Sequence, residues 1–189
     1  MNKIIHSTNL TKIYGEKETS VTALDNINVE FKENEFTAIM GPSGSGKSTL
    51  LHCLAGLDRP TSGQIFLREE DISTLNDKQL TKIRRDSFGF VFQAFNLIPT
   101  LTAEENITLP ASIAGRKPDM DWVKQVVDAV DIGDRLTHRP NELSGGQQQR
   151  VAAARAMATK PEVIFADEPS GNLDSKSSKE LLVFMKSVV

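Results

Sequence analysis

The chain has 189 residues, of which 39% are hydrophobic and 25% charged, a size and composition that suit one hydrophobic core with at most a small second lobe. Its 22 basic and 25 acidic residues give a net charge of −3, which argues against a broad basic surface for nucleic acid. No apolar run reaches the roughly 18 residues of a membrane span, and the N-terminus lacks the apolar segment of a secretion signal, so work at a membrane would require a second chain that spans it.

Strand patterns dominate the N-terminal part of the chain. Ile4 and Ile5 indicate a first strand, and residues 27–32 alternate apolar and polar side chains with the period of a half-buried strand. Asn34 suits a tight left-handed turn, and the apolar run from Phe36 to Met40 indicates a short buried strand after it. These patterns predict a β-rich N-terminal lobe.

Residues 41–49, with the sequence Gly-Pro-Ser-Gly-Ser-Gly-Lys-Ser-Thr, match the phosphate-binding pattern G-x-x-x-x-G-K-[ST]. Glycines allow backbone N–H groups to surround phosphate oxygens, and the N-terminus of a following helix adds partial positive charge. Lys47 is expected to contact the β and γ phosphates, and Ser48 to bind Mg²⁺. A glycine-rich turn before a helix is the structural alternative. Read as a functional motif, the pattern alone predicts a nucleoside triphosphate site and nothing more specific.

A helix from Lys47 to Ala55 is expected after this loop, ended by Gly56 in a left-handed conformation. Cys53 lies on this helix beside leucines, and this single cysteine of the chain is predicted to be a buried structural thiol, which fits a reducing cytosol. Turn residues 58–63 then precede a short strand at 64–67.

The middle of the chain contains both helix and strand patterns. A helix is predicted from Asp77 to Arg85, and an apolar strand from Phe88 to Phe92 delivers Gln93 to the strand end where α/β folds place ligands. Apolar residues at 122–130 repeat at helical spacing behind Asp121, the expected N-cap. These helices predict a helical lobe inserted between strands.

A buried strand followed by two acidic residues lies in the C-terminal part. Val163 to Ala166 is an apolar run typical of a central parallel strand, and it delivers Asp167 and Glu168 at its carboxyl end. A nucleoside triphosphatase needs one carboxylate there for Mg²⁺ and one to accept a proton from water. For these two carboxylates, an acidic helix N-cap after a strand is the alternative of equal weight. A last helix is expected over residues 179–189.

Leu143-Ser144-Gly145-Gly146-Gln147 precedes a helix that is expected over 145–160 and ended by Pro161. Ser144 and Gln147 have the S-x-x-Q spacing of a capping box. Two glycines in a first helical turn lower stability by roughly 1 kcal/mol each relative to alanine, which a plain helix start does not explain. They leave N–H groups of the helix end uncovered, so the pattern predicts a second anion site.

Together these motifs resemble those of ATP-binding cassette (ABC) ATPases, in family order and over nearly the whole chain. Residues 41–49 resemble the Walker A loop, residues 143–147 the signature motif, and residues 163–168 the Walker B strand with its catalytic glutamate. Gln93 resembles the Q-loop glutamine, and residues 170–174 resemble the D-loop. Walker A, signature and Walker B motifs in this order form a specific combination.

The resemblance implies an α/β fold with a P-loop NTPase (RecA-like) core, an N-terminal antiparallel β lobe and an inserted α-helical subdomain at about 94–158, within one domain, 1–189. Residues 57–63, 92–99 and 166–174 are similar to the MacB/LolD-like branch, which pairs with FtsX-like permeases in export, lipoprotein release or antimicrobial peptide resistance. This implies a cytoplasmic subunit, peripheral on the inner face of the plasma membrane through a permease that chooses the transported substrate. ATP and Mg²⁺ are the implied cofactors, and nucleic acid is not an expected partner.

The resemblance also implies a role for each motif residue. Nucleotide contacts within one chain are expected from Tyr14, Gly41, Ser43, Gly44, Ser45, Gly46, Lys47, Ser48 and Thr49. Contacts across a head-to-tail dimer with a second cassette are expected from Ser144, Gly145, Gly146, Gln147 and Asp174. Mg²⁺ is expected at Ser48, Gln93 and Asp167, and catalysis from Glu168, Gln93 and Lys47. Tyr14 is thereby expected to stack on adenine, whereas an isolated tyrosine is usually core or surface filler.

One family feature is missing from the sequence. The family carries a switch histidine beyond the catalytic glutamate, but His6, His52 and His138 all precede Glu168. The expectation is a C-terminally truncated cassette that keeps nucleotide binding. Two alternatives are a soluble mechanical ATPase on DNA or ribosomes, whose long coiled coils or second cassette are lacking here, and a nucleotide-binding module without turnover.

Overall fold

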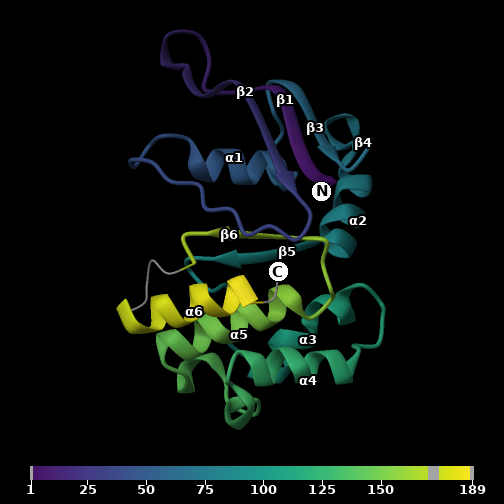
Figure 1. Ribbon diagram of the computed structural model, residues 1–189, viewed down its shortest axis with the longest axis vertical. Coiled ribbons are helices and arrows are strands. Elements are labelled where there is room, and N and C mark those ends of the chain that lie inside the picture. The colour runs from purple at the N-terminus through teal and green to yellow at the C-terminus, as the bar shows by residue number, and fades with distance from the viewer. Residues whose placement is uncertain (1, 170–174, 188–189) are drawn as a thin grey trace. The chain divides into compact units, whose positions relative to one another are not determined.

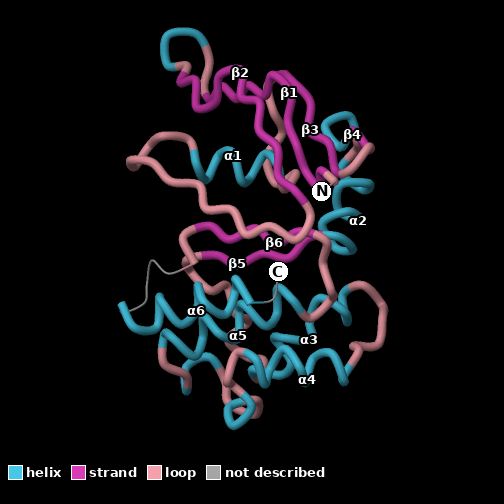
Figure 2. Tube along the Cα trace, in the orientation of Figure 1, coloured by secondary structure: helices cyan, strands magenta, loops and turns pink. Residues whose placement is uncertain are grey.

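The computed structural model describes residues 2–169 and 175–187 (Figure 1). The chain divides into two compact units, Met1–Arg84 and Arg85–Val189. Both units contain helices and strands, which Figure 2 distinguishes by colour. Among the described residues, no helix has both the length and the apolar character needed to cross a bilayer.

The N-terminal unit is built on an antiparallel sheet with the strand order β2-β1-β3-β4. Its elements are β1 (Lys3–Tyr14), β2 (Val21–Lys32), α1 (Lys47–Leu54), β3 (Ser62–Leu67), β4 (Glu70–Asp71) and most of α2 (Asp77–Ser87), with 3₁₀ turns at Lys17–Thr19 and Ile72–Thr74. The predicted antiparallel lobe is confirmed. The strand β1 is longer than expected because its polar residues continue the pairing with β2 as far as Tyr14 and Val21.

Local features of this unit follow the sequence patterns. Ile27, Val29 and Phe31 are half-buried while the polar residues between them are exposed, as alternation predicts. Asn34 has φ 57° and Gly56 has φ 62°, which confirms the left-handed turn before residue 36 and the end of α1. The buried position of Cys53 is also as predicted, and burial raises the pKa of its thiol to about 11.

The segment from Phe36 to Met40 contradicts the sequence prediction of a buried strand. It has no regular structure, and Phe36 is 39% exposed and Met40 89% exposed. A strand exists only where its backbone groups pair with those of a neighbour, and the sheet of this unit does not include the segment. The apolar run indicated β propensity correctly but carried no information about a partner strand.

The C-terminal unit contains a pair of parallel strands with helices on one side of it (Figure 1). Its elements are β5 (Phe88–Phe92), α3 (Ala103–Ile113), α4 (Met120–Ala129), α5 (Gly145–Met157), β6 (Val163–Asp167) and α6 (Ser175–Ser187), with 3₁₀ turns at Gly133–Arg135 and Pro140–Glu142. Phe88 pairs with Val163 and Phe92 with Asp167. The two predicted apolar strands are therefore confirmed, and both end at the same edge.

The core of this unit lies between its helices and the strand pair. Buried residues from α3, α4 and α5 include Ile107, Val126 and Val151. The helix α5 lies against β5 so closely that a Cβ on Gly89 would be 2.3 Å from the carbonyl oxygen of Ala156. Glycine at this position allows the close contact, which fixes α5 relative to the strand.

Helix boundaries differ from the sequence prediction at several places, among them the end of α2, which is Ser87 and not Arg85. The N-cap of α4 is Asp119, whose carboxylate accepts a backbone N–H at 3.1 Å, while Asp121 lies in the first turn. The helix α5 ends at Met157, earlier than predicted, and Lys160 has φ 53°, which no helix continues through. The helix α6 begins earlier than predicted, at Ser175.

Candidate nucleotide-binding site

The glycine loop of residues 41–49 uses left-handed backbone at two positions. Gly44 has φ 78° and Gly46 has φ 86°. A Cβ on Gly46 would be 2.5 Å from the carbonyl oxygen of Ala23, so only glycine fits there, whereas a Cβ on Gly44 would meet no atom within 4 Å. The loop is therefore tightly packed against Ala23 at Gly46, whereas open space lies beside its backbone at Gly44.

Lys47 lies across this loop. Its Nζ donates to the carbonyl oxygens of Gly41 at 3.0 Å and Pro42 at 2.8 Å, and it lies 3.4 Å from the hydroxyl of Ser45. Hydrogen bonds between two charged groups are stronger than those to neutral acceptors. A phosphate entering the loop therefore offers the ammonium better partners than those it has here.

The helix α1 begins directly after the loop. Its N-cap is Gly46, which provides no side-chain cap. The first N–H groups of a helix have no intrahelical acceptor, and they carry the positive end of the helix dipole. Ser48 and Thr49 are half-buried in this first turn. Loop and helix start together have the chemistry of an anion site.

Tyr14 lies at the end of β1 with 41% of its surface exposed. Its hydroxyl donates to Asp58 Oδ2 at 2.6 Å, and this bond to a carboxylate raises the pKa of Tyr14. Lys12 Nζ donates to Asp58 Oδ1 at 2.6 Å and lies 4.7 Å from the centroid of the Tyr14 ring. Two contacts therefore hold an aromatic ring that still faces solvent in part.

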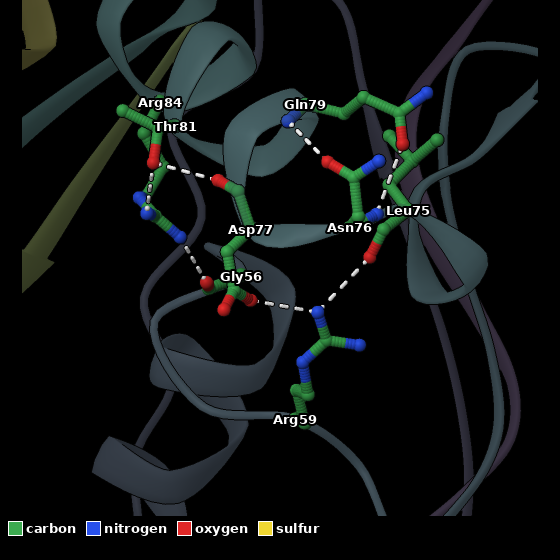
Figure 3. A network of polar contacts seen from close by, with 8 residues as sticks. All are labelled: Gly56, Arg59, Leu75, Asn76, Asp77, Gln79, Thr81 and Arg84. Carbon is green, nitrogen blue, oxygen red and sulfur yellow. Dashed lines mark hydrogen bonds and ion pairs between the residues drawn. The ribbon is translucent and has the colours of Figure 1, made fainter.

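The turn that carries Asp58 is held by the polar network of Figure 3. Arg84 donates to the carbonyl oxygen of Gly56 at 2.6 Å, just after α1. Arg59 donates to the carboxylate of Asp77 at 2.7 Å. These bonds connect the turn to α2 at two points and so hold Asp58 where it accepts the hydroxyl of Tyr14.

Gln93, Asp167 and Glu168 lie at one edge of the parallel strand pair. Because Phe92 pairs with Asp167, Gln93 and Glu168 follow at equivalent positions of neighbouring strands, and both are exposed. Glu168 has φ 47°, a conformation that residues with a Cβ seldom adopt and that is often found at functional sites. The edge thus presents an amide and two carboxylates.

The helix α5 begins with a complete capping box, as predicted. The hydroxyl of Ser144 accepts the backbone N–H of Gln147 at 3.3 Å, and Gln147 Oε1 accepts the backbone N–H of Ser144 at 2.8 Å. Ser144 and Gly145 are exposed. The N–H groups of Gly145 and Gly146 precede the first intrahelical bond, so the two glycines present donors that the capping box does not use.

The predicted site residues fall in both units. The N-terminal unit contains Tyr14 and residues 41–49, and the C-terminal unit contains Gln93, residues 143–147, Asp167 and Glu168. Asp174, the predicted D-loop residue, lies outside the described residues. Among the residues that are described, no three His, Cys, Asp or Glu side chains form a cluster that could hold a metal.

Four further side chains contact the predicted site residues or the segments that carry them, and these four were not predicted from the sequence. Lys12 and Asp58 lie at Tyr14, and Gln149 and Arg155 of α5 donate to carbonyl oxygens in the segments that follow β6 and β5. The two α5 residues are polar and flank a buried apolar run, Val151 to Ala154, and that contrast is a usable signal. Lys12 and Asp58 have no comparable local signal because distant segments meet there.

Comparisons with known proteins agree with this geometry. A family model described as ABC transporter matches residues 24–171. The chain is 47% identical to LolD, the lipoprotein-releasing system ATP-binding protein of Geobacter metallireducens, over 96% of this chain and 81% of that protein. It is 48% identical to MacB, a macrolide export ATP-binding/permease protein of Marinobacter nauticus, over 95% of this chain and 28% of that protein.

Solved structures of an ABC transporter cassette have the same fold as this chain. The dimeric structure of MJ0796 from Methanocaldococcus jannaschii, described as a bacterial ABC transporter cassette, has a TM-score of 0.88 and 45% identity, covering 97% of this chain and 82% of that one. A post-hydrolysis state of that cassette bound to ADP and Pi gives a TM-score of 0.87 and 44% identity, with the same coverage.

These similarities confirm the predicted P-loop NTPase fold with its antiparallel β lobe. The names of the relatives are those of transport proteins, which argues against the alternatives of a DNA or ribosome ATPase and of a module without turnover. The chain therefore belongs to the ABC transporter family, as an ATP-binding and ATP-hydrolysing subunit of the MacB and LolD type.

Proposed function

We propose that this chain works as one half of a head-to-tail pair of cassettes, with ATP bound between them. The observation that carries the proposal is the presence of two helix starts suited to anions, one at Gly46 in the N-terminal unit and one at Ser144 in the C-terminal unit. Two half-sites on each chain suit two composite sites in a symmetric pair. The dimeric structure of the related cassette MJ0796 supports this arrangement.

Phosphate binding is assigned to the glycine loop and the start of α1. Lys47 exchanges its two carbonyl partners for oxygens of the β and γ phosphates. The remaining contacts within the chain come from Gly41, Ser43, Gly44, Ser45, Gly46, Ser48 and Thr49. Tyr14 stacks on the adenine, an interaction worth roughly 1–3 kcal/mol per base in proteins that bind nucleic acid bases.

Mg²⁺ is assigned to Ser48, Gln93 and Asp167, together with phosphate oxygens and water. These residues offer a hydroxyl, an amide oxygen and a carboxylate, and such hard oxygen ligands fit Mg²⁺, which usually takes one or two carboxylates beside substrate phosphates. When bound, the ion neutralises charge that develops on the phosphates.

Glu168 is assigned as the general base. Its carboxylate, exposed after β6, accepts a proton from a water molecule whose oxygen forms a bond to the γ phosphorus. The bond between that phosphorus and the bridging oxygen of ADP breaks, and ADP and inorganic phosphate are the products. Gln93, at the equivalent position after β5, orients groups at the same strand edge.

The signature residues are assigned to the partner's nucleotide. Ser144, Gly145 and Gly146 donate to the γ phosphate held by the glycine loop of the other cassette, with Gln147 at the same helix start. Asp174, outside the described residues, is assigned to the same interface. A single chain then binds ATP by itself and hydrolyses it slowly, because half of each site is missing.

The partner that receives the motion is proposed to be an integral membrane permease, of the FtsX-like class. The relatives MacB and LolD are named for macrolide export and lipoprotein release, which supports an export-type role. The helical part at about 94–158 and the segment at Gln93 are the proposed contact surface. The chain is then peripheral on the cytoplasmic face of the plasma membrane.

The experiment that tests this function is the substitution Glu168→Gln. Loss of a general base lowers a rate by typically 10²–10⁴-fold, so steady-state ATP turnover should fall by about that factor while ATP affinity stays the same. An ATP-bound dimer should then accumulate in size-exclusion chromatography. Glu70→Gln, at an exposed carboxylate on β4, is the matched control and should change neither property. Unchanged turnover in Glu168→Gln would show that the base is another group.

A further inference from the structure

The side chain of Arg155 connects α5 to the segment that follows β5. Its two terminal nitrogens donate to the carbonyl oxygens of Phe95 at 2.7 Å and Asn96 at 2.6 Å. A guanidinium is planar and presents several N–H groups in a fixed arrangement, so one side chain can hold two successive carbonyls. A lysine ammonium at the same place lacks that fixed geometry.

The segment that Arg155 contacts has an unfavourable backbone. Phe95 has φ 58° and Asn96 has φ 52°, and two successive left-handed residues with a Cβ occur only where surrounding contacts hold them. Phe95 lacks the short polar side chain that makes this conformation easier for asparagine. The segment begins at Gln93, two residues before Phe95, so a change in its backbone conformation would reach Gln93 within two residues.

Arg155 is itself firmly placed. It is half-buried, and burial lowers the pKa of its guanidinium, which nevertheless stays protonated. The next residue, Ala156, belongs to the close contact between α5 and Gly89 of β5. The base of the Arg155 side chain is therefore fixed relative to the strand that leads into Gln93.

The same helix makes a corresponding bond on the other strand. Gln149 is 0% exposed, and its Nε2 donates to the carbonyl oxygen of Pro169, the residue after Glu168. Its Oε1 has no hydrogen-bond partner in the part of the chain that the structure describes. A fully buried amide that satisfies only one of its groups is costly, so the bond it does make has a positional value. Glu168 is again a left-handed residue.

We propose that α5 sets the conformation of both segments at the strand edge, with Arg155 as the positioning residue for Gln93 and Gln149 as the positioning residue for Glu168. The inference rests on the proposed roles of Gln93 and Glu168. Since α5 begins at Ser144, any displacement of this helix start by the partner's nucleotide moves the two donors and the two segments together.

The test compares Arg155→Met with Arg150→Met on the purified chain. Arg150 lies on the same helix and donates to the carbonyl oxygen of Val130 at 2.9 Å, so its substitution removes a similar bond at a different place. Three quantities are measured: ATP turnover as kcat and KM, the Mg²⁺ concentration that gives half-maximal turnover, and hydrogen exchange of the peptide spanning residues 92–97.

Arg155→Met should raise the Mg²⁺ requirement and lower kcat, each by about tenfold, as expected for the loss of a charge-assisted hydrogen bond, with the KM for ATP nearly unchanged. Exchange of the 92–97 peptide should become faster. Arg155→Lys, which keeps the charge, should recover part of each effect, and it replaces the methionine variant if that fails to fold. Arg150→Met should leave the Mg²⁺ requirement unchanged. If Arg155→Met and Arg150→Met both change only the thermal stability, the proposal is wrong.

Gln93→Ala separates the two possible failures. If Gln93→Ala raises the Mg²⁺ requirement and Arg155→Met does not, Gln93 keeps its proposed role and the positioning by Arg155 is refuted. If neither variant raises it, the role assigned to Gln93 is wrong, and the inference that rests on it is refuted too. For the second strand, Gln149→Met should lower kcat with the KM for ATP unchanged, and an unchanged kcat would remove Gln149 from the proposal.

Discussion

The starts of α1 and α5 differ in how their N–H groups are satisfied. The helix α1 begins at Gly46 without a side-chain cap, whereas α5 begins with reciprocal hydrogen bonds between Ser144 and Gln147. At the first, no side chain caps the N–H groups, so they are open to an anion, whereas at the second the capping box already uses the N–H groups of Ser144 and Gln147 and leaves those of Gly145 and Gly146 for an anion. The glycine loop is therefore ready for phosphate in the isolated chain, while the signature helix is stable without it.

The largest effect is expected when the positive charge of the glycine loop is removed. Lys47→Met deletes the ammonium that now bonds two carbonyl oxygens. Charged hydrogen bonds are worth about 1.5–3 kcal/mol, so the ATP affinity of the isolated chain should fall by about 100-fold in a fluorescent-nucleotide titration. Lys78→Met, on α2, serves as control and should leave affinity unchanged. Equal affinities for Lys47→Met and the unmodified chain would mean that phosphate does not bind in this loop.

A smaller effect is expected from the backbone of the same loop. Gly46→Ala places a Cβ 2.5 Å from the carbonyl oxygen of Ala23 and forces a left-handed conformation, while Gly44→Ala imposes only the conformation. We expect Gly46→Ala to lose about 2 kcal/mol of unfolding free energy or more, and Gly44→Ala about 1 kcal/mol. Urea denaturation measures both. The same loss in both variants would contradict the steric role of Gly46.

Substitutions of Ser144 separate its contribution to the stability of α5 from its proposed contact with phosphate. Ser144→Asp keeps an N-cap acceptor, so unfolding free energy should stay within about 0.5 kcal/mol, but its carboxylate repels phosphate. ATP turnover should fall about tenfold while nucleotide affinity of the isolated chain is unchanged. Ser144→Ala should instead cost about 1 kcal/mol of stability. If Ser144→Asp hydrolyses ATP normally, the start of α5 does not contact a nucleotide.

The smallest effect concerns the tyrosine of the N-terminal unit. Burial acts to raise the pKa of Asp58, but hydrogen bonds from Lys12 and Tyr14 outweigh it and lower the pKa. A lowered carboxyl pKa adds stability that is complete above the ordinary value of about 3.9 and is lost as pH falls through the folded-state pKa. Asp58→Asn should therefore be less stable at pH 7, by about 1 kcal/mol or less, and the difference should shrink below about pH 4.

The substitution Asp58→Asn should also change ATP binding. If Tyr14 stacks on adenine, releasing its hydroxyl should weaken ATP binding by roughly two- to fivefold, the equivalent of about 1 kcal/mol or less. Asp71→Asn is a matched control, because hydrogen bonds to Ser73 and Gln64 also outweigh burial in lowering the pKa of Asp71, away from the tyrosine. Equal ATP affinity in both variants would remove Asp58 from nucleotide binding.

Local chemistry explains which features could be predicted from sequence. The capping box at Ser144 was predictable because both partners lie within four residues, and the strands at Phe88 and Val163 because their apolar runs are bounded by polar residues. The left-handed Gly46 occupies a fixed position of the phosphate-binding pattern, whereas the left-handed Gly44 occupies a position that the pattern leaves open.

Features that depend on distant partners were not predictable. The run from Phe36 to Met40 has strand propensity, but pairing depends on segments elsewhere in the chain. Asp119 and Asp121 are equally good caps by type, and only the geometry of the first turn decides between them. The contacts of Arg155 with Asn96 join residues that are 59 positions apart, which no local pattern encodes.

The burial of Cys53 has a practical consequence for studying the motions proposed above. A thiol with a pKa of about 11 is almost entirely protonated at pH 7–8, and the thiolate is the form that alkylating and disulfide-forming reagents attack. Cys53, the single cysteine of the chain, should therefore react very slowly with maleimide probes. A cysteine introduced at an exposed position outside the proposed phosphate contacts, such as residue 141, can be labelled selectively in the otherwise unmodified chain to report on the start of α5.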